Sequence, residues 1–181
     1  MVCILWVVGG HQNGNGYGRV ILRRDATGVV KAYRIVTMHK ANDGTDVQFE
    51  FNDESDGTIR LIDLLSGFIT SLEEERVFVV DELDRSLHPI LTYNFVDFFL
   101  KSTQGFPNQL IVTTHESGLL DLDLLRRDEI WFVEKNQQGA TNLYALEEFM
   151  PRHDKDIRRG YLQGRYGAIP VVRKLRELGW E

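Results

Sequence analysis

The sequence predicts an α/β fold in which a mainly parallel sheet with flanking helices is joined, on its amino-terminal side, by an antiparallel β meander. Two short apolar segments, 77–80 (VFVV) and 109–113 (QLIVT), predict the parallel sheet, because continuous apolar runs are typical of central strands covered on both faces. Residues 89–100 between them have the length and pattern of a helix. Strand, helix and strand in this order predict neighbouring parallel strands with a right-handed crossover.

The meander is predicted from three segments in the first third of the chain. Residues 19–24 and 29–39 have the composition of strands, and residues 47–51 (VQFEF) alternate between apolar and polar side chains. The tripeptide at 42–44 (NDG) is a strong turn signal. Because strict alternation indicates one face in solvent, this sheet is expected to differ in kind from the buried one.

Composition divides the chain into three expected parts: residues 1–52 with the antiparallel sheet and a glycine-rich loop, residues 53–150 with the α/β half, and a basic extension at 151–181. Residues 1–150 hold 13 Lys/Arg and 23 Asp/Glu, a net charge of −10, whereas residues 151–181 hold 8 and 4, a net charge of +4. Such an extension could meet phosphate or an acidic surface. Because the acidic body repels a nucleic-acid backbone, we favour a solvated or intramolecular role.

The bulk composition is that of a soluble globular protein and excludes several other classes. The 181 residues are 43% hydrophobic and 27% charged. The single cysteine, Cys3, excludes an internal disulfide framework and a cysteine-rich zinc site. The apolar start at residues 2–8 is too short to span a bilayer and has no basic leader, so we expect a cytoplasmic protein with no membrane partner.

An acidic pair, Asp81 and Glu82, directly follows the first of the two apolar strands. Open α/β sheets bind ligands at the carboxyl ends of their strands. An acidic pair at that place can divide two tasks, with Asp81 holding Mg²⁺ and Glu82 polarising an attacking water. The alternative is a strand that runs into an acidic loop capping the next helix.

A histidine follows the second apolar strand, which ends in Thr114-His115-Glu116. If the two strands are parallel neighbours, His115 ends its strand near the place where Asp81 and Glu82 end theirs. These three residues, which are distant in the sequence, are therefore expected to form one site.

A polar loop at 52–58 opens directly into a predicted helix. The helix has one apolar stripe, at Ile59, Ile62, Leu65, Ile69 and Leu72. Hydroxyl groups, free backbone N–H groups and the positive end of the helix dipole suit a phosphate at this point. A loop that only caps the helix has the same pattern.

The glycine-rich residues 9–18 (GGHQNGNGYG) follow the first apolar segment, where a phosphate-binding loop is expected. A P-loop requires G-x-x-x-x-G-K-[ST], in which the lysine reaches the phosphates and the hydroxyl binds Mg²⁺. Because no lysine occurs before Lys31, we interpret residues 9–18 as a flexible surface loop.

Three segments in this order, 54–58 (ESDGT), 77–82 (VFVVDE) and 113–117 (TTHES), resemble the signature motif, Walker B motif and switch histidine of ABC-type ATPase heads. The sequence is most similar to bacterial AAA family ATP-binding proteins, the group that includes abortive-infection and overcoming-lysogenisation-defect ATPases. The LHP at 87–89 also resembles that group, and the segments DEIWFVEK and YLQGRYGAIP together resemble one branch of it. The resemblance covers roughly residues 30–181 and implies the carboxy-terminal half of a partial ABC-type P-loop NTPase head, with ATP and Mg²⁺ as its cofactors.

The resemblance implies a role for each matching residue. Asp81 corresponds to the Mg²⁺-associated aspartate, Glu82 to the general base, and His115 to the histidine that contacts the γ-phosphate. In the family the signature residues complete the ATP site of the opposite subunit of a dimer, and hydrolysis then releases the dimer. The residues expected to bind nucleotide are Ser55, Asp56, Gly57, Thr58, Asp84 and His88.

Two departures from the family pattern bear on activity. His88 replaces the aspartate that transporter heads carry in the D-loop, and it is alternatively a helix-capping or core histidine. The Walker A lysine loop and the glutamine loop are missing; in the family they lie in an amino-terminal half that this chain is expected to lack. Because that loop supplies most of the affinity for the triphosphate, the chain is expected to be inactive alone.

Three functions are therefore open. The first is ATP binding and hydrolysis in phage defence, as a homodimer or with a complementing segment that bears Walker A. The second is a dimerisation or interaction module that does not hydrolyse ATP and docks on a nuclease, a nucleic-acid-processing partner or a defence partner. The third is a metal-dependent nuclease that uses Asp81, Glu82 and Asp84, although Asp84 is expected to point away from the other two.

Overall fold

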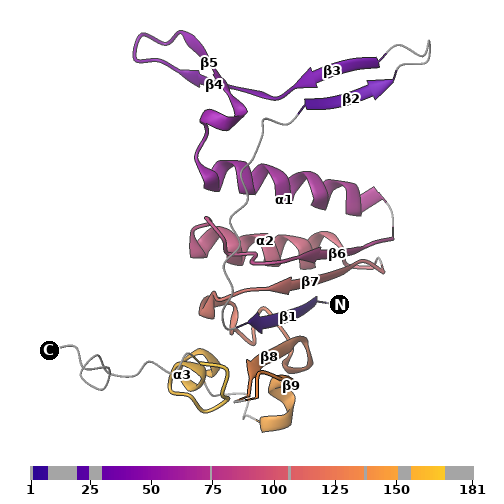
Figure 1. The fold of residues 1–181 in the computed structure, drawn as a ribbon, viewed down its shortest axis with the longest axis vertical. Coiled ribbons are helices and arrows are strands. Elements are labelled where there is room, and N and C mark those ends of the chain that lie inside the picture. Colours follow the sequence, from indigo (N-terminus) through magenta and orange to yellow (C-terminus); the bar gives the residue numbers. More distant parts are fainter. Residues whose placement is uncertain are drawn as a thin grey trace, which may run out of the picture. The chain divides into compact units, whose positions relative to one another are not determined.

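The computed structural model describes residues 2–7, 20–24, 30–73, 75–105, 107–136, 138–150 and 156–169. The chain forms two compact units, one of residues 1–10 and 67–181 and one of residues 11–66, and each is described by itself (Figure 1). The boundaries expected from composition, at residues 52 and 150, stay a prediction.

A five-stranded sheet is the centre of the first unit, with the strand order β6-β7-β1-β8-β9. Strands β6, β7, β1 and β8 are parallel, and β9 is antiparallel to β8 (Figure 1). The strands are β1 (Val2–Val7), β6 (Val77–Val80), β7 (Gln109–Thr113), β8 (Ile130–Lys135) and β9 (Thr141–Ala145). The mixed α/β fold and the parallel pairing of the two predicted strands are confirmed.

The helix between β6 and β7 is α2 (Pro89–Ser102), as the sequence predicts. It packs through aromatic rings against the second half of α1 (Asp56–Glu73). The ring centroid of Phe68 in α1 lies 6.1 Å from that of Phe95 and 5.6 Å from that of Phe99. Phe68 and Phe99 are each 1% exposed. Gly67 lies against the ring of Phe78, so β6 is covered on this side.

The two faces of the sheet differ in burial. Leu110, Val112 and Phe132 on one face are fully buried, with 0% exposure. On the other face Val77 is 55% exposed and Val79 is 67% exposed. The expectation that residues 77–80 form a central strand covered on both faces is therefore wrong, because β6 lies at the edge of the sheet as described and only one of its faces is covered.

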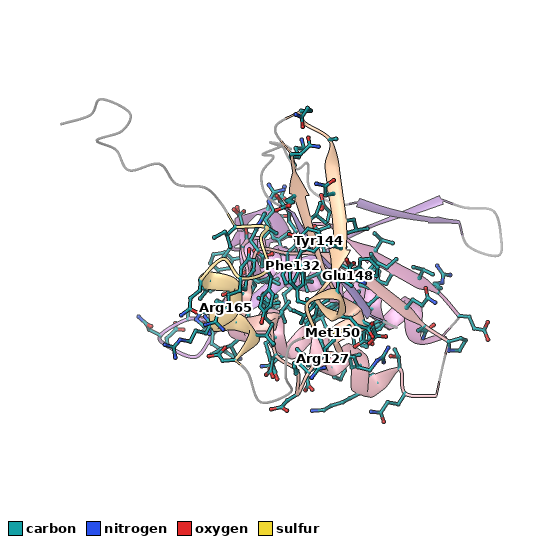
Figure 2. All side chains as sticks on the ribbon, turned by 90° about the horizontal axis from the view of Figure 1, so that it is seen from below. Arg127, Phe132, Tyr144, Glu148, Met150 and Arg165 are labelled. Carbon is teal, nitrogen blue, oxygen red and sulfur yellow. The ribbon has the colours of Figure 1, made fainter. Side chains whose placement is uncertain are left out.

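Aromatic packing holds the segment after β9 against β8. The ring of Phe132, which lies close to Tyr144 (Figure 2), stacks against Tyr161 of α3 (Ile157–Leu162) and against Tyr166, with centroid distances of 5.7 and 5.9 Å. The hydroxyl of Tyr144 donates to the Tyr166 carbonyl at 2.9 Å, and that of Tyr161 donates to the Ala168 carbonyl at 3.0 Å. This segment therefore belongs to the core of the first unit.

The second unit contains two antiparallel hairpins and the first half of α1. The hairpins are β2 (Val20–Arg24) with β3 (Val30–Arg34), and β4 (Val36–Lys40) with β5 (Asp46–Glu50). The predicted turn at 42–44 is confirmed, with a positive φ of 83° at Gly44. The expected single meander is instead two separate two-stranded sheets, because the predicted strand 29–39 breaks between β3 and β4.

Short 3-10 helices connect these elements: η1 (Phe51–Asp53), η2 (Ser117–Leu119), η3 (Arg127–Glu129) and η4 (Leu146–Phe149). In the part of the chain that the structure describes, no helix combines the length and the apolar character needed to cross a bilayer.

Candidate functional site

The carboxyl ends of β7 and β1 form a topological switch point. These strands are parallel neighbours, yet the chain leaves β7 toward β8 on one side and leaves β1 toward β6 on the other. Open α/β sheets bind ligands outside the carboxyl ends of their strands at such a point. Thr113, the last residue of β7, pairs with Leu5 of β1 at this edge.

The acidic pair is tied to the end of β7 through Thr113. The Thr113 hydroxyl donates a hydrogen bond to the Asp81 carboxylate, and the same oxygen accepts the backbone N–H of Glu82 at 2.8 Å. The N–H of Leu83 donates to the Thr113 carbonyl at 2.9 Å, and the Leu83 side chain is fully buried. Asp81 and Glu82 are therefore fixed in place where the sheet ends.

Glu82 has a left-handed backbone, with φ of 48°. A residue with a side chain rarely adopts this conformation, which costs about 1–3 kcal/mol and is concentrated at functional sites. The Glu82 side chain is 37% exposed, and the Arg85 guanidinium lies 3.9 Å from its carboxylate. The carboxylate is therefore open to water and has a cation nearby.

Asp84 joins the same turn to the loop that carries His115. One oxygen of its carboxylate, Oδ1, accepts the Thr114 hydroxyl at 2.6 Å and the backbone N–H of His115 at 3.1 Å. The His115 side chain is exposed, and no hydrogen bond or ion pair of its imidazole is formed with the described residues. The structure thus brings the His115 loop to the acidic turn and leaves the ring available.

His88 caps α2. Its Nδ1 accepts the N–H of Ile90 at 3.2 Å, and Pro89 is the first residue of the helix. The structure thus shows the helix-capping alternative for His88. A contact with nucleotide at His88 stays a prediction.

Ser55 to Thr58 lie in the second unit and begin α1. The Ser55 hydroxyl accepts the N–H of Thr58 at 3.2 Å and lies 2.9 Å from the Thr58 hydroxyl, as an N-cap does. Ser55 and Asp56 are exposed, and Gly57 is half-buried in the first turn. The capping role left open by the sequence is therefore present, and a second role toward phosphate stays a prediction.

Glu54, next to this cap, is held by β4. Its Oε1 accepts the hydroxyl of Thr37 and lies 2.5 Å from Nε2 of His39. The Thr37 hydrogen bond, and after it the His39 bond, lower the pKa of Glu54 below its ordinary value. Local sequence pattern does not predict this cluster, because Thr37 and His39 lie 17 and 15 residues before Glu54 and reach it only through the position of β4.

The oxygen donors at the sheet edge suit Mg²⁺ bound to a nucleotide. Among the described residues no group of three or more His, Cys, Asp or Glu could hold a metal ion by itself. Mg²⁺ usually needs only one or two carboxylates, with phosphates and waters as its other ligands. Asp81 meets that need, whereas Asp81, Glu82 and Asp84, the residues of the alternative nuclease, do not form a group that could hold a metal ion by itself.

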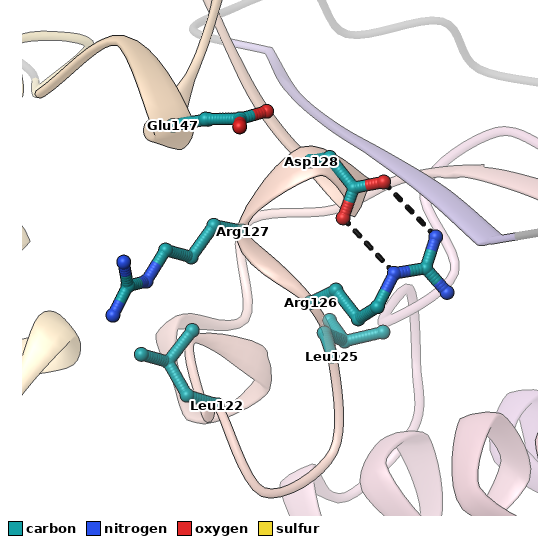
Figure 3. A pocket seen from close by; sticks show the side chains of 6 residues that line it. All are labelled: Leu122, Leu125, Arg126, Arg127, Asp128 and Glu147. Atoms are coloured by element: carbon teal, nitrogen blue, oxygen red, sulfur yellow. Dashed lines mark hydrogen bonds and ion pairs between the residues drawn. The ribbon is translucent and has the colours of Figure 1, made fainter. Parts of the chain in front are cut away.

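A separate pocket of about 300 Å³ lies beside η3 (Figure 3). The Arg126 guanidinium makes two 3.0 Å bonds to Asp128 and lies 2.9 Å from Glu129. The bond to Arg126 lowers the pKa of the Asp128 carboxyl. The pocket is lined by Leu122, Leu125, Arg126, Arg127, Asp128 and Glu147, so none of the predicted site residues lies in its wall.

Residues 10–121, more than half of the chain, match the protein family described as "AAA domain, putative AbiEii toxin, Type IV TA system". The matched segment contains the start of α1, the acidic turn after β6 and the His115 loop. No curated protein matches the chain. The chain therefore belongs to this AAA-domain family, which is a family of P-loop ATPases.

Proposed function

We propose that the chain supplies the Mg²⁺ and water-activating side of an ATP site in an ABC-type ATPase head. One observation carries the proposal: the turn with Asp81 and Glu82 and the loop with His115 are hydrogen-bonded together at the switch point of the sheet. Family membership supports ATP as the ligand.

Each of the three residues has a distinct role in this proposal. Asp81 holds Mg²⁺, directly or through water. Bound Mg²⁺ neutralises charge on the phosphates. Glu82, whose carboxylate is open to water, polarises the attacking water and accepts its proton. His115, with its exposed ring, donates to an oxygen of the γ-phosphate.

We further propose that Ser55 to Thr58 complete the site of a second copy of the chain. Ser55 and Asp56 are exposed at the start of an 18-residue helix, α1, where backbone N–H groups and the helix dipole favour phosphate. A contact of this kind lasts only while the γ-phosphate is present, so hydrolysis would open the dimer.

The proposed ATP site lacks the lysine of a P-loop. Residues 9–18 lie outside the described residues, and their sequence contains no lysine. They directly follow β1, and a P-loop follows a strand in the same way. We propose that the chain alone binds ATP weakly and that a complementing segment supplies the lysine.

Calorimetric titration of the full chain with Mg-ATP tests this proposal. We expect a dissociation constant weaker than about 1 mM for the wild type. The triple variant His11→Gly, Tyr17→Lys, Gly18→Ser has the G-x-x-x-x-G-K-S pattern after β1 and is expected to bind at least tenfold more tightly. Asp81→Asn in that variant should cancel the gain. Micromolar binding by the wild type would refute the missing-lysine argument.

The role of Glu82 has its own test in any form of the protein that hydrolyses ATP. Glu82→Gln removes the base but keeps the size of the side chain, so we expect bound ATP to accumulate while turnover falls at least 100-fold. Unchanged turnover in this variant would exclude Glu82 as the base.

The second candidate function is an interaction module that does not hydrolyse ATP. It is favoured by the absence of lysine in residues 9–18 and by the exposed Val77 and Val79 on the open face of the sheet. Light scattering of the full chain with and without Mg-ATP separates the two functions. A dimer that forms only with nucleotide favours the ATPase, and a dimer of the same strength without nucleotide favours the module.

A further inference from the structure

Asp84 organises three consecutive residues after β7 with a single oxygen atom. Its Oδ1 accepts the hydroxyl of Thr114 and the backbone N–H of His115. The Thr114 hydroxyl in turn accepts the N–H of Glu116 at 3.0 Å, and Thr114 is only 1% exposed. The conformation of residues 114–116 therefore depends on this carboxylate.

Asp84 is itself held firmly, so it can act as an anchor. The residue before it, Leu83, is fully buried and bonded to the Thr113 carbonyl. The carbonyl of Asp84 accepts the N–H of Leu87 at 3.0 Å and closes a tight turn. The Asp84 side chain thus projects from a rigid turn toward a loop that is 30 residues further along the chain.

We propose that Asp84 is a positioning residue, which sets the His115 loop against the acidic turn by accepting hydrogen bonds and which does not itself bind Mg²⁺ or nucleotide. That the position of the His115 loop matters for catalysis rests on the function proposed above. The geometry distinguishes Asp84 from Asp81, because Asp81 accepts a hydrogen bond from Thr113 at the end of β7, whereas Asp84 accepts the backbone N–H of His115.

Two substitutions separate hydrogen bonding from charge. Asp84→Asn keeps an oxygen in the place of Oδ1, so it can still accept from Thr114 and His115, but it removes the negative charge. Asp84→Ala removes the acceptor as well. A positioning residue is rescued by the asparagine, whereas a metal ligand is impaired by both changes.

The first measurement is hydrogen exchange of the His115 backbone amide by NMR in the full chain. We expect Asp84→Ala to speed exchange about tenfold or more, and Asp84→Asn to change it less than about threefold. Exchange that is unchanged in Asp84→Ala would overturn the proposal. This result does not depend on ATP, so it stands or falls separately from the proposed function.

The second measurement uses Mn²⁺ alone as the probe and records the paramagnetic broadening of resonances in residues 81–84. Asp81→Asn is expected to reduce the broadening, and Asp84→Asn is expected to keep it within about twofold of the wild type. Equal loss in both variants would overturn the proposal, because Asp84 would then be a metal ligand.

A second pair of variants tests the same hydrogen bond in case the Asp84→Ala chain does not fold. Thr114→Val removes the hydroxyl that donates to Asp84, and Thr114→Ser keeps it. We expect Thr114→Val to speed His115 exchange at least threefold over Thr114→Ser, and equal rates would overturn the proposal.

In the triple variant with the P-loop pattern, Asp84→Ala should lower kcat more than tenfold with little change in KM, and Asp84→Asn should restore kcat.

Discussion

The hydroxyl of Thr113, the last residue of β7, donates a hydrogen bond to the carboxylate of Asp81, the first residue after β6. The same oxygen accepts the N–H of Glu82, so one side chain holds both acidic residues at the sheet edge. A threonine at this place thus joins the two halves of the candidate site.

Removal of the Thr113 hydroxyl should destabilise the first unit. Thr113→Val has nearly the same shape but leaves the Glu82 N–H without its acceptor and Asp81 without this donor, so the free energy of unfolding is expected to fall by about 1–3 kcal/mol. Thr113→Ser keeps the hydroxyl and should cost less than about 1 kcal/mol. Urea denaturation of both variants measures the difference, and equal losses would show that the hydroxyl contributes nothing.

Acid should weaken the second unit through Glu54. The hydrogen bond from Thr37, and then the one from His39, lower the pKa of Glu54 from the usual 4.5, so the folded state binds its proton less readily than the unfolded state. The stabilisation is therefore complete above the usual pKa and is lost as the pH falls through the lower folded pKa. Urea midpoints between about pH 6 and about pH 3 should fall further in the wild type than in Glu54→Gln. Parallel falls in both proteins would contradict this.

Crowding should make Gly167 far less tolerant of a side chain than Gly139. Both glycines have positive φ, 70° and 80°, so alanine costs about 1–2 kcal/mol at either place. A Cβ at Gly167 would lie 2.5 Å from the Tyr144 hydroxyl, whereas one at Gly139 would meet nothing within 4 Å. We expect Gly167→Ala to lower the free energy of unfolding by about 1–3 kcal/mol more than Gly139→Ala. Thermal unfolding of the pair tests this, and similar melting temperatures would refute it.

Two buried threonines should respond in opposite directions to valine. Thr92 of α2 is fully buried, and its hydroxyl has no hydrogen-bond partner among the residues that the structure describes. The hydroxyl of Thr103 donates to the Phe99 carbonyl at 2.8 Å. Thr92→Val removes an unsatisfied buried hydroxyl, so we expect it to raise the free energy of unfolding by about 1 kcal/mol. Thr103→Val removes a hydrogen bond, so we expect it to lower the free energy of unfolding by about 1 kcal/mol. Denaturant midpoints measure both, and a loss in Thr92→Val would contradict the first expectation.

The sequence by itself determined the α/β class, the two parallel strands with α2 between them and the meeting of Asp81, Glu82 and the His115 loop. Local pattern is sufficient for these features. Apolar runs of the right length form strands, and the right-handed crossover makes the two strands parallel neighbours, so the residues that follow them share one edge.

Only the tertiary structure decided where the other strands lie in the sheet and which side chains form hydrogen bonds with distant parts of the chain. It placed β1 between β7 and β8, left one face of β6 open, and joined Asp84 to the His115 loop and Glu54 to β4. The order of apolar and polar residues within a segment determines the secondary structure of that segment and which of its faces is apolar. The order and register of strands depend on contacts between distant segments, and these set burial and hydrogen bonding at each end of the sheet.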